Sequence, residues 1–73
     1  MLNELDTVVL TEDLPEHGLK RGDVGTVIFA DRGGRGYEVE FKALTGDTVA
    51  IVAAGPTQVR PVDRKEIASA RMM

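Results

Sequence analysis

A glycine turn that opens directly into a β-branched strand is the feature that most constrains how this chain can fold. The turn ends in Gly22-Asp23, and the segment 24–28 that follows reads Val-Gly-Thr-Val-Ile. Gly22 stands where a type II turn requires a positive φ, and the Asp23 carboxylate can bond back to the turn backbone. Because Thr, Val and Ile favour extended backbone, the segment indicates a strand that enters from a tight turn, as in small β-barrels.

The length limits the chain to one small domain, which we expect to span residues 1–73. The sequence contains no cysteine, so disulfides and thiolate metal sites are excluded and stability must come from apolar packing or from association. The first residues do not resemble a signal peptide, and the longest apolar run, 49–54, is far shorter than the roughly 20 residues of a membrane span. We therefore expect a soluble, cytoplasmic protein.

Five short segments carry strand signals, separated by glycine-rich turns at 31–36 and 44–47 and by a long loop at 12–23. Leu14 and Leu19 should pin that loop inward, and Gly25 predicts a bulge or a bend. The predicted strands are 7–11, 24–30, 37–42, 48–53 and 58–62. The third is the clearest, because apolar and charged residues alternate along it. The predicted core consists of Val8, Leu10, Leu14, Val27, Phe29, Val39, Phe41, Ile51 and Val59, with Tyr37 on the same side.

This order of elements is typical of SH3-like (Src-homology-3-like) barrels, and we predict an all-β, five-stranded barrel of that class. Residues 63–73 form either a short helix with Asp63 as its N-cap, an additional edge strand or a frayed tail.

Three stretches, residues 14–27, 37–41 and 59–62, resemble a family of short bacterial proteins, common in cyanobacteria, that is catalogued as a domain of unknown function (the DUF "four-nine-two-six" group). The resemblance implies an SH3-like fold and no particular activity. Residues 20–27 also resemble the KOW element of ribosomal and transcription-elongation proteins, which contacts nucleic acid. KOW domains on RNA are usually basic, whereas this chain has a net charge of -3.

The sequence offers little material for catalysis. His17 is the only histidine, and no metal-ligand spacing is present. Glu16 beside His17 lacks the dry pocket that acid–base chemistry needs. Glu38 and Glu40 share one strand face, which suits either a carboxylate pair or, more simply, a solvated face. We expect no enzyme activity, no catalytic residue, no metal and no cofactor.

The basic residues are the remaining candidates for a binding site. The segment 32–36 (Arg-Gly-Gly-Arg-Gly) resembles a single RGG-type RNA contact but is also what a hairpin turn requires. All three aromatic residues are assigned to the core, which leaves no platform for stacking bases. Binding is assigned to Lys20, Arg21, Arg32, Arg35 and Arg60.

Two hypotheses of function follow. The first is a non-enzymatic module that binds another protein or itself, such as an accessory, antitoxin-like or immunity-like partner of another bacterial protein, held by charged loops and a strand edge. The alternative is a KOW-like nucleic-acid-binding domain that uses the five basic residues. Interleaving of these bases with Glu38 and Glu40 would favour the first, and their convergence on one face would favour the second. The sequence indicates neither a membrane contact nor a small-molecule substrate.

Overall fold

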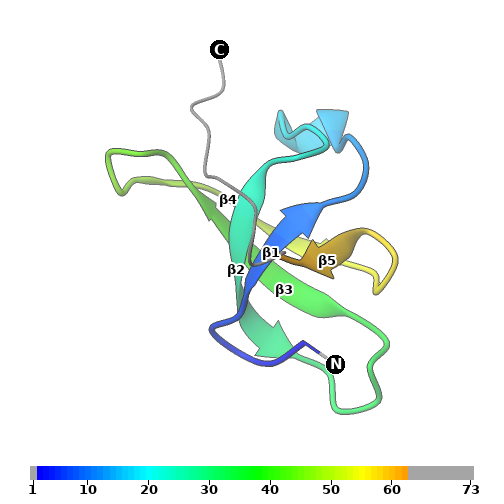
Figure 1. Ribbon diagram of the computed structural model, residues 1–73. Helices are drawn as coiled ribbons and strands as arrows, with labels where there is room; N and C mark the ends of the chain where they lie inside the picture. Colours follow the sequence, from blue (N-terminus) through cyan, green and yellow to red (C-terminus); the bar gives the residue numbers. More distant parts are fainter. Residues whose placement is uncertain (1, 63–73) are drawn as a thin grey trace.

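The computed structural model of the chain describes residues 2–62 and shows a single antiparallel β-sheet (Figure 1). Its five strands are β1 (Thr7–Leu10), β2 (Val24–Ala30), β3 (Tyr37–Lys42), β4 (Thr48–Ala54) and β5 (Val59–Pro61). A one-turn 3₁₀ helix, η1 (Pro15–His17), lies in the long first loop. All five predicted strands are present, and none of their ends is displaced by more than one residue.

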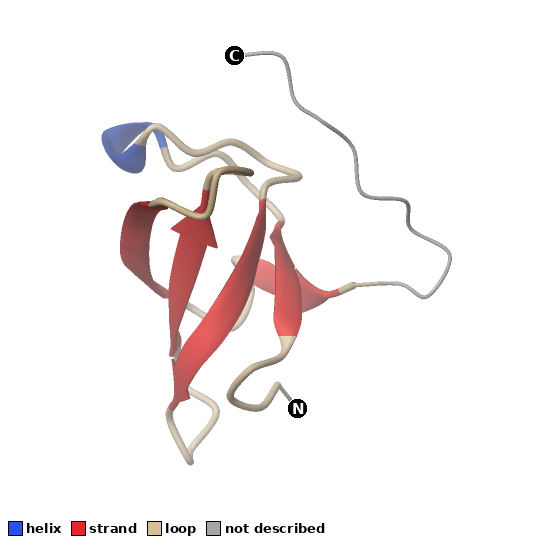
Figure 2. Cartoon of the chain, turned by 90° about the vertical axis from the view of Figure 1, so that its left-hand side faces the viewer, coloured by secondary structure: helices blue, strands red, loops and turns tan. Residues whose placement is uncertain are grey.

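The strands lie in the order β4-β3-β2-β1-β5, and each pairs with its neighbours in antiparallel fashion. The sheet is strongly twisted and wraps around its inner face (Figure 2). The predicted all-β class is thus confirmed. Within residues 2–62, β4 and β5 are edge strands and the sheet stays open, so closure into an SH3-like barrel stays a prediction. The helix or extra strand predicted for 63–73 lies outside the described residues.

The first loop folds as its sequence predicts. Leu14 and Leu19 are buried and pair with each other through reciprocal backbone hydrogen bonds of 2.9 and 3.1 Å. Gly22 has a φ of 95°, the positive value that the turn requires. The Asp23 carboxylate accepts a 2.9 Å hydrogen bond from the Lys20 amide, and this bond closes the turn. The turn is therefore fixed by local residues before β2 begins.

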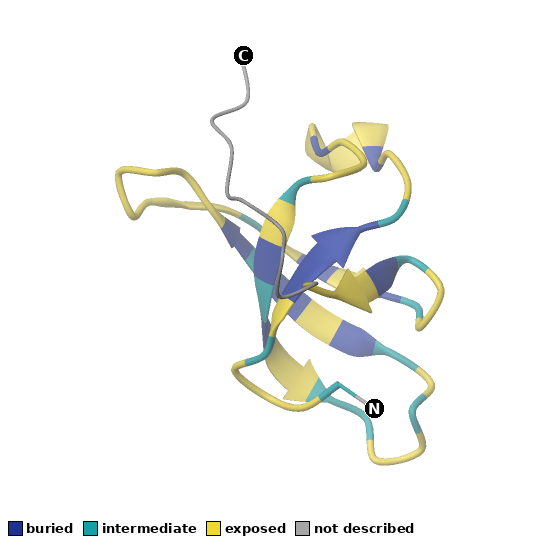
Figure 3. Ribbon diagram, viewed as in Figure 1, coloured by how far each residue is buried: buried dark blue, intermediate teal, exposed yellow. Residues whose placement is uncertain are grey.

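The core lies on the inner face of the curled sheet, where buried residues from all five strands come together (Figure 3). Seven of the predicted core residues are buried, together with Tyr37. Phe29 and Ile51 were also predicted to lie in the core, but both are wrong: they are 50% and 54% exposed. The core also contains Leu19, Val52 and Ala54.

A β-bulge explains the position of Phe29. The pairing of β2 with β3 shifts register between Val27 and Phe29, so Ile28 is an extra residue in the strand. Since side chains alternate between the faces of a strand, one extra residue moves every later side chain to the opposite face. Phe29 consequently lies outward beside Glu38, and Ala30 packs against the core in its place.

The error at Ile51 has a different cause. β4 is apolar throughout except for Thr48, so no alternation shows which face is buried. The pairing of Val39 with Val52 places Val52 and Ala54 on the core side. Ile51, the residue before Val52, lies opposite Glu40 on the other face of the sheet. Only the register with β3 decides this.

Gly25 was predicted to mark a bulge or bend, but the bulge lies three residues further on, at Ile28. What requires glycine at position 25 is close packing. A Cβ atom there would lie 2.6 Å from Val39 Cγ1 and 2.8 Å from Phe41 Cε1. Val39 and Phe41 of the neighbouring strand β3 therefore fill the space that a side chain at position 25 would need.

Candidate binding surface

The five basic residues predicted to bind a partner are all exposed, but they are distributed over the ends of the sheet. Lys20 and Arg21 precede β2, whereas Arg32 and Arg35 follow it, so the length of this seven-residue strand, roughly 23 Å, separates the two pairs. Arg60 lies on β5 and lines one shallow hollow together with Arg21. The structure thus brings Arg21 and Arg60 together and leaves the β2–β3 loop pair apart from them.

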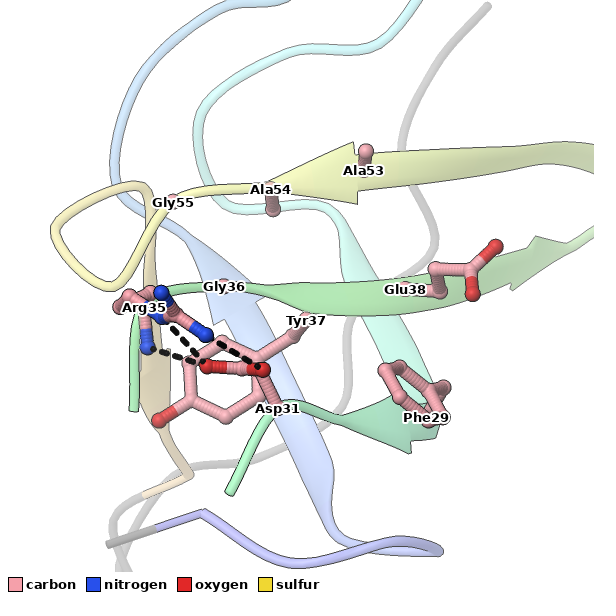
Figure 4. A pocket seen from close by; sticks show the side chains of 9 residues that line it. All are labelled: Phe29, Asp31, Arg35, Gly36, Tyr37, Glu38, Ala53, Ala54 and Gly55. Atoms are coloured by element: carbon pink, nitrogen blue, oxygen red, sulfur yellow. Dashed lines mark hydrogen bonds and ion pairs between the residues drawn. The ribbon is translucent and has the colours of Figure 1, made fainter. Parts of the chain in front are cut away.

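Arg35 is engaged within its own loop. Its Nε lies 3.0 Å from Asp31 Oδ2, and the same carboxylate oxygen accepts the backbone N–H of Gly33 at 3.1 Å. The hydrogen bond from the Arg35 side chain lowers the pKa of Asp31 below its ordinary value, and backbone hydrogen bonds from Arg35 and Gly33 act in the same direction. Arg35 therefore orders the glycine-rich turn (Figure 4).

A mixed apolar and acidic surface covers the convex side of β2, β3 and β4. The registers place six residues there in two cross-strand rows. One row is Phe29, Glu38 and Ala53, and the other is Thr26, Glu40 and Ile51. We call these six residues the outer face. Phe29 and Ile51 lie at diagonally opposite corners, with the two carboxylates on the strand between them.

The two carboxylates of the outer face differ in their contacts. Glu40 is half-buried; it accepts a 2.8 Å hydrogen bond from the Thr48 hydroxyl, and Lys42 Nζ lies 3.8 Å from it. Glu38 is exposed, and its carboxylate has no hydrogen bond or ion pair with another residue in 2–62. Of the two, Glu38 is therefore the carboxylate available to a partner.

A shallow hollow of about 360 Å³ adjoins Phe29 and Glu38 and extends to Tyr37 and the Asp31–Arg35 pair (Figure 4). Its volume is near the lower limit of small-molecule sites, which are typically about 300–1,000 Å³ and largely enclosed. The hollow lies open at the surface, so it lacks the enclosure that is typical of a small-molecule site.

The described part of the chain contains no group of three or more His, Cys, Asp or Glu residues able to hold a metal ion. His17 is exposed at the end of η1. No helix within residues 2–62 is long and apolar enough to span a membrane.

Residues 2–62 thus form a small all-β domain of five antiparallel strands in one open sheet. The chain belongs to the family described as domain of unknown function DUF4926, which it matches over residues 4–61. Comparisons with curated proteins and with solved structures give no match.

Sequence reasoning missed the outer face because it placed Phe29 and Ile51 in the core. Glu38 and Glu40 were recognised as a pair on a solvated strand face, and that assignment agrees with their positions. No glycine marks the bulge at Ile28, so no local signal identifies Phe29 as exposed.

Proposed function

We propose that this chain is a non-enzymatic protein-binding module. Its outer face binds a protein segment that presents an apolar side chain beside a lysine or arginine. The observation that supports this proposal best is the Glu38 carboxylate, exposed and without a partner in the described chain, in the same cross-strand row as the half-exposed Phe29. Aromatic side chains are enriched at the centres of protein interfaces, and complementary charges set the specificity and register of the contact.

The charge of the outer face favours a protein partner over a nucleic acid. Two carboxylates stand on its central strand, and the Lys42 ammonium lies beside one of them. Nucleic-acid affinity depends largely on neutralising phosphates, which carboxylates repel. A cationic side chain of a protein partner, in contrast, gains an ion pair with Glu38. The lack of cysteine suits a reducing bacterial cytoplasm, where we expect the module to act.

The exposed ring of Phe29 would supply much of the binding energy. Full burial of a phenylalanine side chain contributes about 1.5–3 kcal/mol, so covering the exposed half contributes about 1 kcal/mol. The lysine or arginine of the partner, paired with the Glu38 carboxylate, then provides the specificity among segments that present an apolar side chain.

The test begins with the immobilised chain, which captures its partner from the source cell, and continues by titration calorimetry with the purified partner. We expect Phe29→Ala and Glu38→Lys each to weaken binding by about fivefold or more, in line with a loss of about 1 kcal/mol. Leu44→Ala, a change on the fully exposed β3–β4 turn, should leave the affinity unchanged. Equal affinity for all three variants and the wild type would refute the outer face as the binding site.

A KOW-like nucleic-acid-binding domain remains the alternative, and one observation favours it. Arg21 and Arg60, far apart in the sequence, line the same hollow beside β1. Fluorescence anisotropy with single-stranded and duplex oligonucleotides tests this alternative at about 0.15 M salt, where the Debye length is roughly 8 Å. Micromolar binding that disappears when Arg21 and Arg60 become Ala, and persists when Arg32 and Arg35 become Ala, would replace the protein-binding proposal.

A further inference from the structure

The two edges of the sheet differ in how they are protected against pairing with another strand. β5 has three residues, and Arg60 and Pro61 are two of them. A charge and a proline, which has no N–H to donate, are devices that keep an edge unpaired. β4 has seven residues, Thr48–Ala54, and none of them is charged or proline. Among the described residues, β4 pairs only with β3.

The side chains of β4 make this edge more suitable still for pairing. Val49 and Ile51 are 57% and 54% exposed, and Ala53 is exposed as well. In an antiparallel ladder, alternate residues direct their N–H and C=O groups away from the existing partner. Within residues 2–62, the outer edge of β4 therefore offers backbone groups with no strand partner, flanked by apolar side chains.

We propose that β4 pairs with β4 of a second copy of this chain, antiparallel and about a two-fold axis at Ile51, to form a continuous ten-stranded sheet. A two-fold interface places the same surface of both copies against itself, so a charged strand would meet like charges across the axis. β4 carries no charge and meets none. Ala50 and Val52, both apolar, lie opposite each other in this register.

The interface is centred where β4 is most regular. The register with β3 shifts between Phe41 and Lys42 and leaves Val49 as the bulged residue, so Ala50, Ile51 and Val52 form the middle of the pairing. The three regular residues of the two copies overlap over about 10 Å, and the bulge at Val49 limits the pairing beyond them. An edge contact of this length belongs to the small interfaces, below about 1,200 Å² in total, which are typically weak and reversible. We therefore expect a dimer that dissociates at micromolar concentrations.

This inference does not rest on the proposed function, although Ile51 and Ala53 belong both to the outer face and to β4. The pairing uses the edge of β4, and Phe29 and Glu38, two and one strands away, stay accessible in both copies. Its test uses the purified chain alone. A chain that fails to dimerise would refute the β4 pairing and not the proposed binding of another protein, and a chain that binds no other protein would leave the β4 pairing standing.

The first experiment is light scattering of the full chain over a concentration series. The mass should rise from the 7.9 kDa monomer towards twice that value between micromolar and millimolar concentration. Ile51→Lys, which puts two like charges opposite each other at the axis, should shift the midpoint at least tenfold to higher concentration. Leu44→Lys, an equally charged change on an exposed turn outside β4, should leave the midpoint in place. A chain that stays monomeric throughout would refute the proposal.

The second experiment locates the interface. Because the sequence has no cysteine, each single-cysteine variant carries one thiol. Ile51→Cys places two Cα atoms about 4.5–5.5 Å apart across the axis, within the range that a disulfide spans. Phe29→Cys, at a position of nearly the same exposure, places them five strand spacings apart, roughly 24 Å. Under mild oxidation, rapid cross-linking of Ile51→Cys alone supports edge pairing. Equal cross-linking of both variants would show that the copies stack face to face and would overturn the proposal.

Discussion

Gly25→Ala is the substitution whose cost the structure specifies most directly. Gly25 is buried in β2 and packs against β3. The added methyl would lie 2.6 Å from Val39 Cγ1, 2.8 Å from Phe41 Cε1 and 3.0 Å from the Glu40 carbonyl oxygen. Real Cβ contacts are almost never shorter than 3.0 Å, so β2 and β3 must separate or the two core side chains must move.

The magnitude follows from the cost of overpacking. Forcing one methyl group into a well-packed core costs about 1–3 kcal/mol, and we expect the upper half of this range because Val39 and Phe41 are themselves buried. Alanine is otherwise favoured over glycine, since it restricts the unfolded chain and so stabilises by about 0.4–1 kcal/mol where it fits. The expected loss is thus about 2 kcal/mol, a large part of the 5–15 kcal/mol typical of folded domains.

Urea denaturation followed by circular dichroism measures this loss, and Val39→Ala provides the control. Combined with Gly25→Ala, it removes the closest clashing atom, so the double variant should lose less stability than the sum of the two single losses. The contacts with Phe41 and the Glu40 backbone remain, so relief should be partial. Gly25→Ala as stable as the wild type, or strictly additive losses, would refute the close packing of Val39 and Phe41 against Gly25.

Three further predictions concern the core, the first turn and the glycine-rich loop. Phe41→Ala should lose roughly 3–5 kcal/mol of unfolding free energy in the same assay, because the Phe41 ring is buried. Phe29→Ala should lose less than about 1 kcal/mol, because Phe29 is 50% exposed, and equal losses for the two variants would contradict the bulge at Ile28. Gly22→Val should lose more than about 1 kcal/mol, although a Cβ there meets no atom, because its φ is 95°; an unchanged urea midpoint would contradict the turn assignment. Asp31 should titrate by NMR below its ordinary pKa of 3.8. A carboxylate whose pKa is lowered by folding stabilises above its ordinary pKa, and this stabilisation disappears as the pH falls through the lowered value. Arg35→Ala should return the midpoint towards 3.8, and a midpoint that does not move would exclude the ion pair as the cause.

Local residues predicted the strands and turns because their signals are short-range. The alternation of Tyr37, Val39 and Phe41 with charged residues identified β3 and its buried face. The positive φ of Gly22 followed from the turn it closes, and the glycine-rich segment before β3 proved to be a loop. These elements depend on the backbone preferences of a few neighbouring residues, and such preferences can be predicted from the residue types.

The five basic residues show how far a binding site can be predicted from residue type alone. Their exposure was predictable, since arginine and lysine are rarely buried. Their grouping was not, because Arg21 and Arg60 meet through the pairing of β1 with β5, between residues far apart in the chain. The ion pair of Arg35 with Asp31 lay within a single turn, yet its geometry depends on the conformation that the glycines adopt.

The sequence by itself determined the all-β class, the strand positions, the inward leucines of the first loop and the buried face of β3. The tertiary structure alone decided which face of β2 and β4 meets the core. One unmarked extra residue at Ile28 turned Phe29 outward, and pairing with Val39 selected Val52 over Ile51. Because strand side chains alternate with a period of two, a shift of one residue exchanges the two faces, and only the pairing of strands across the sheet fixes that register.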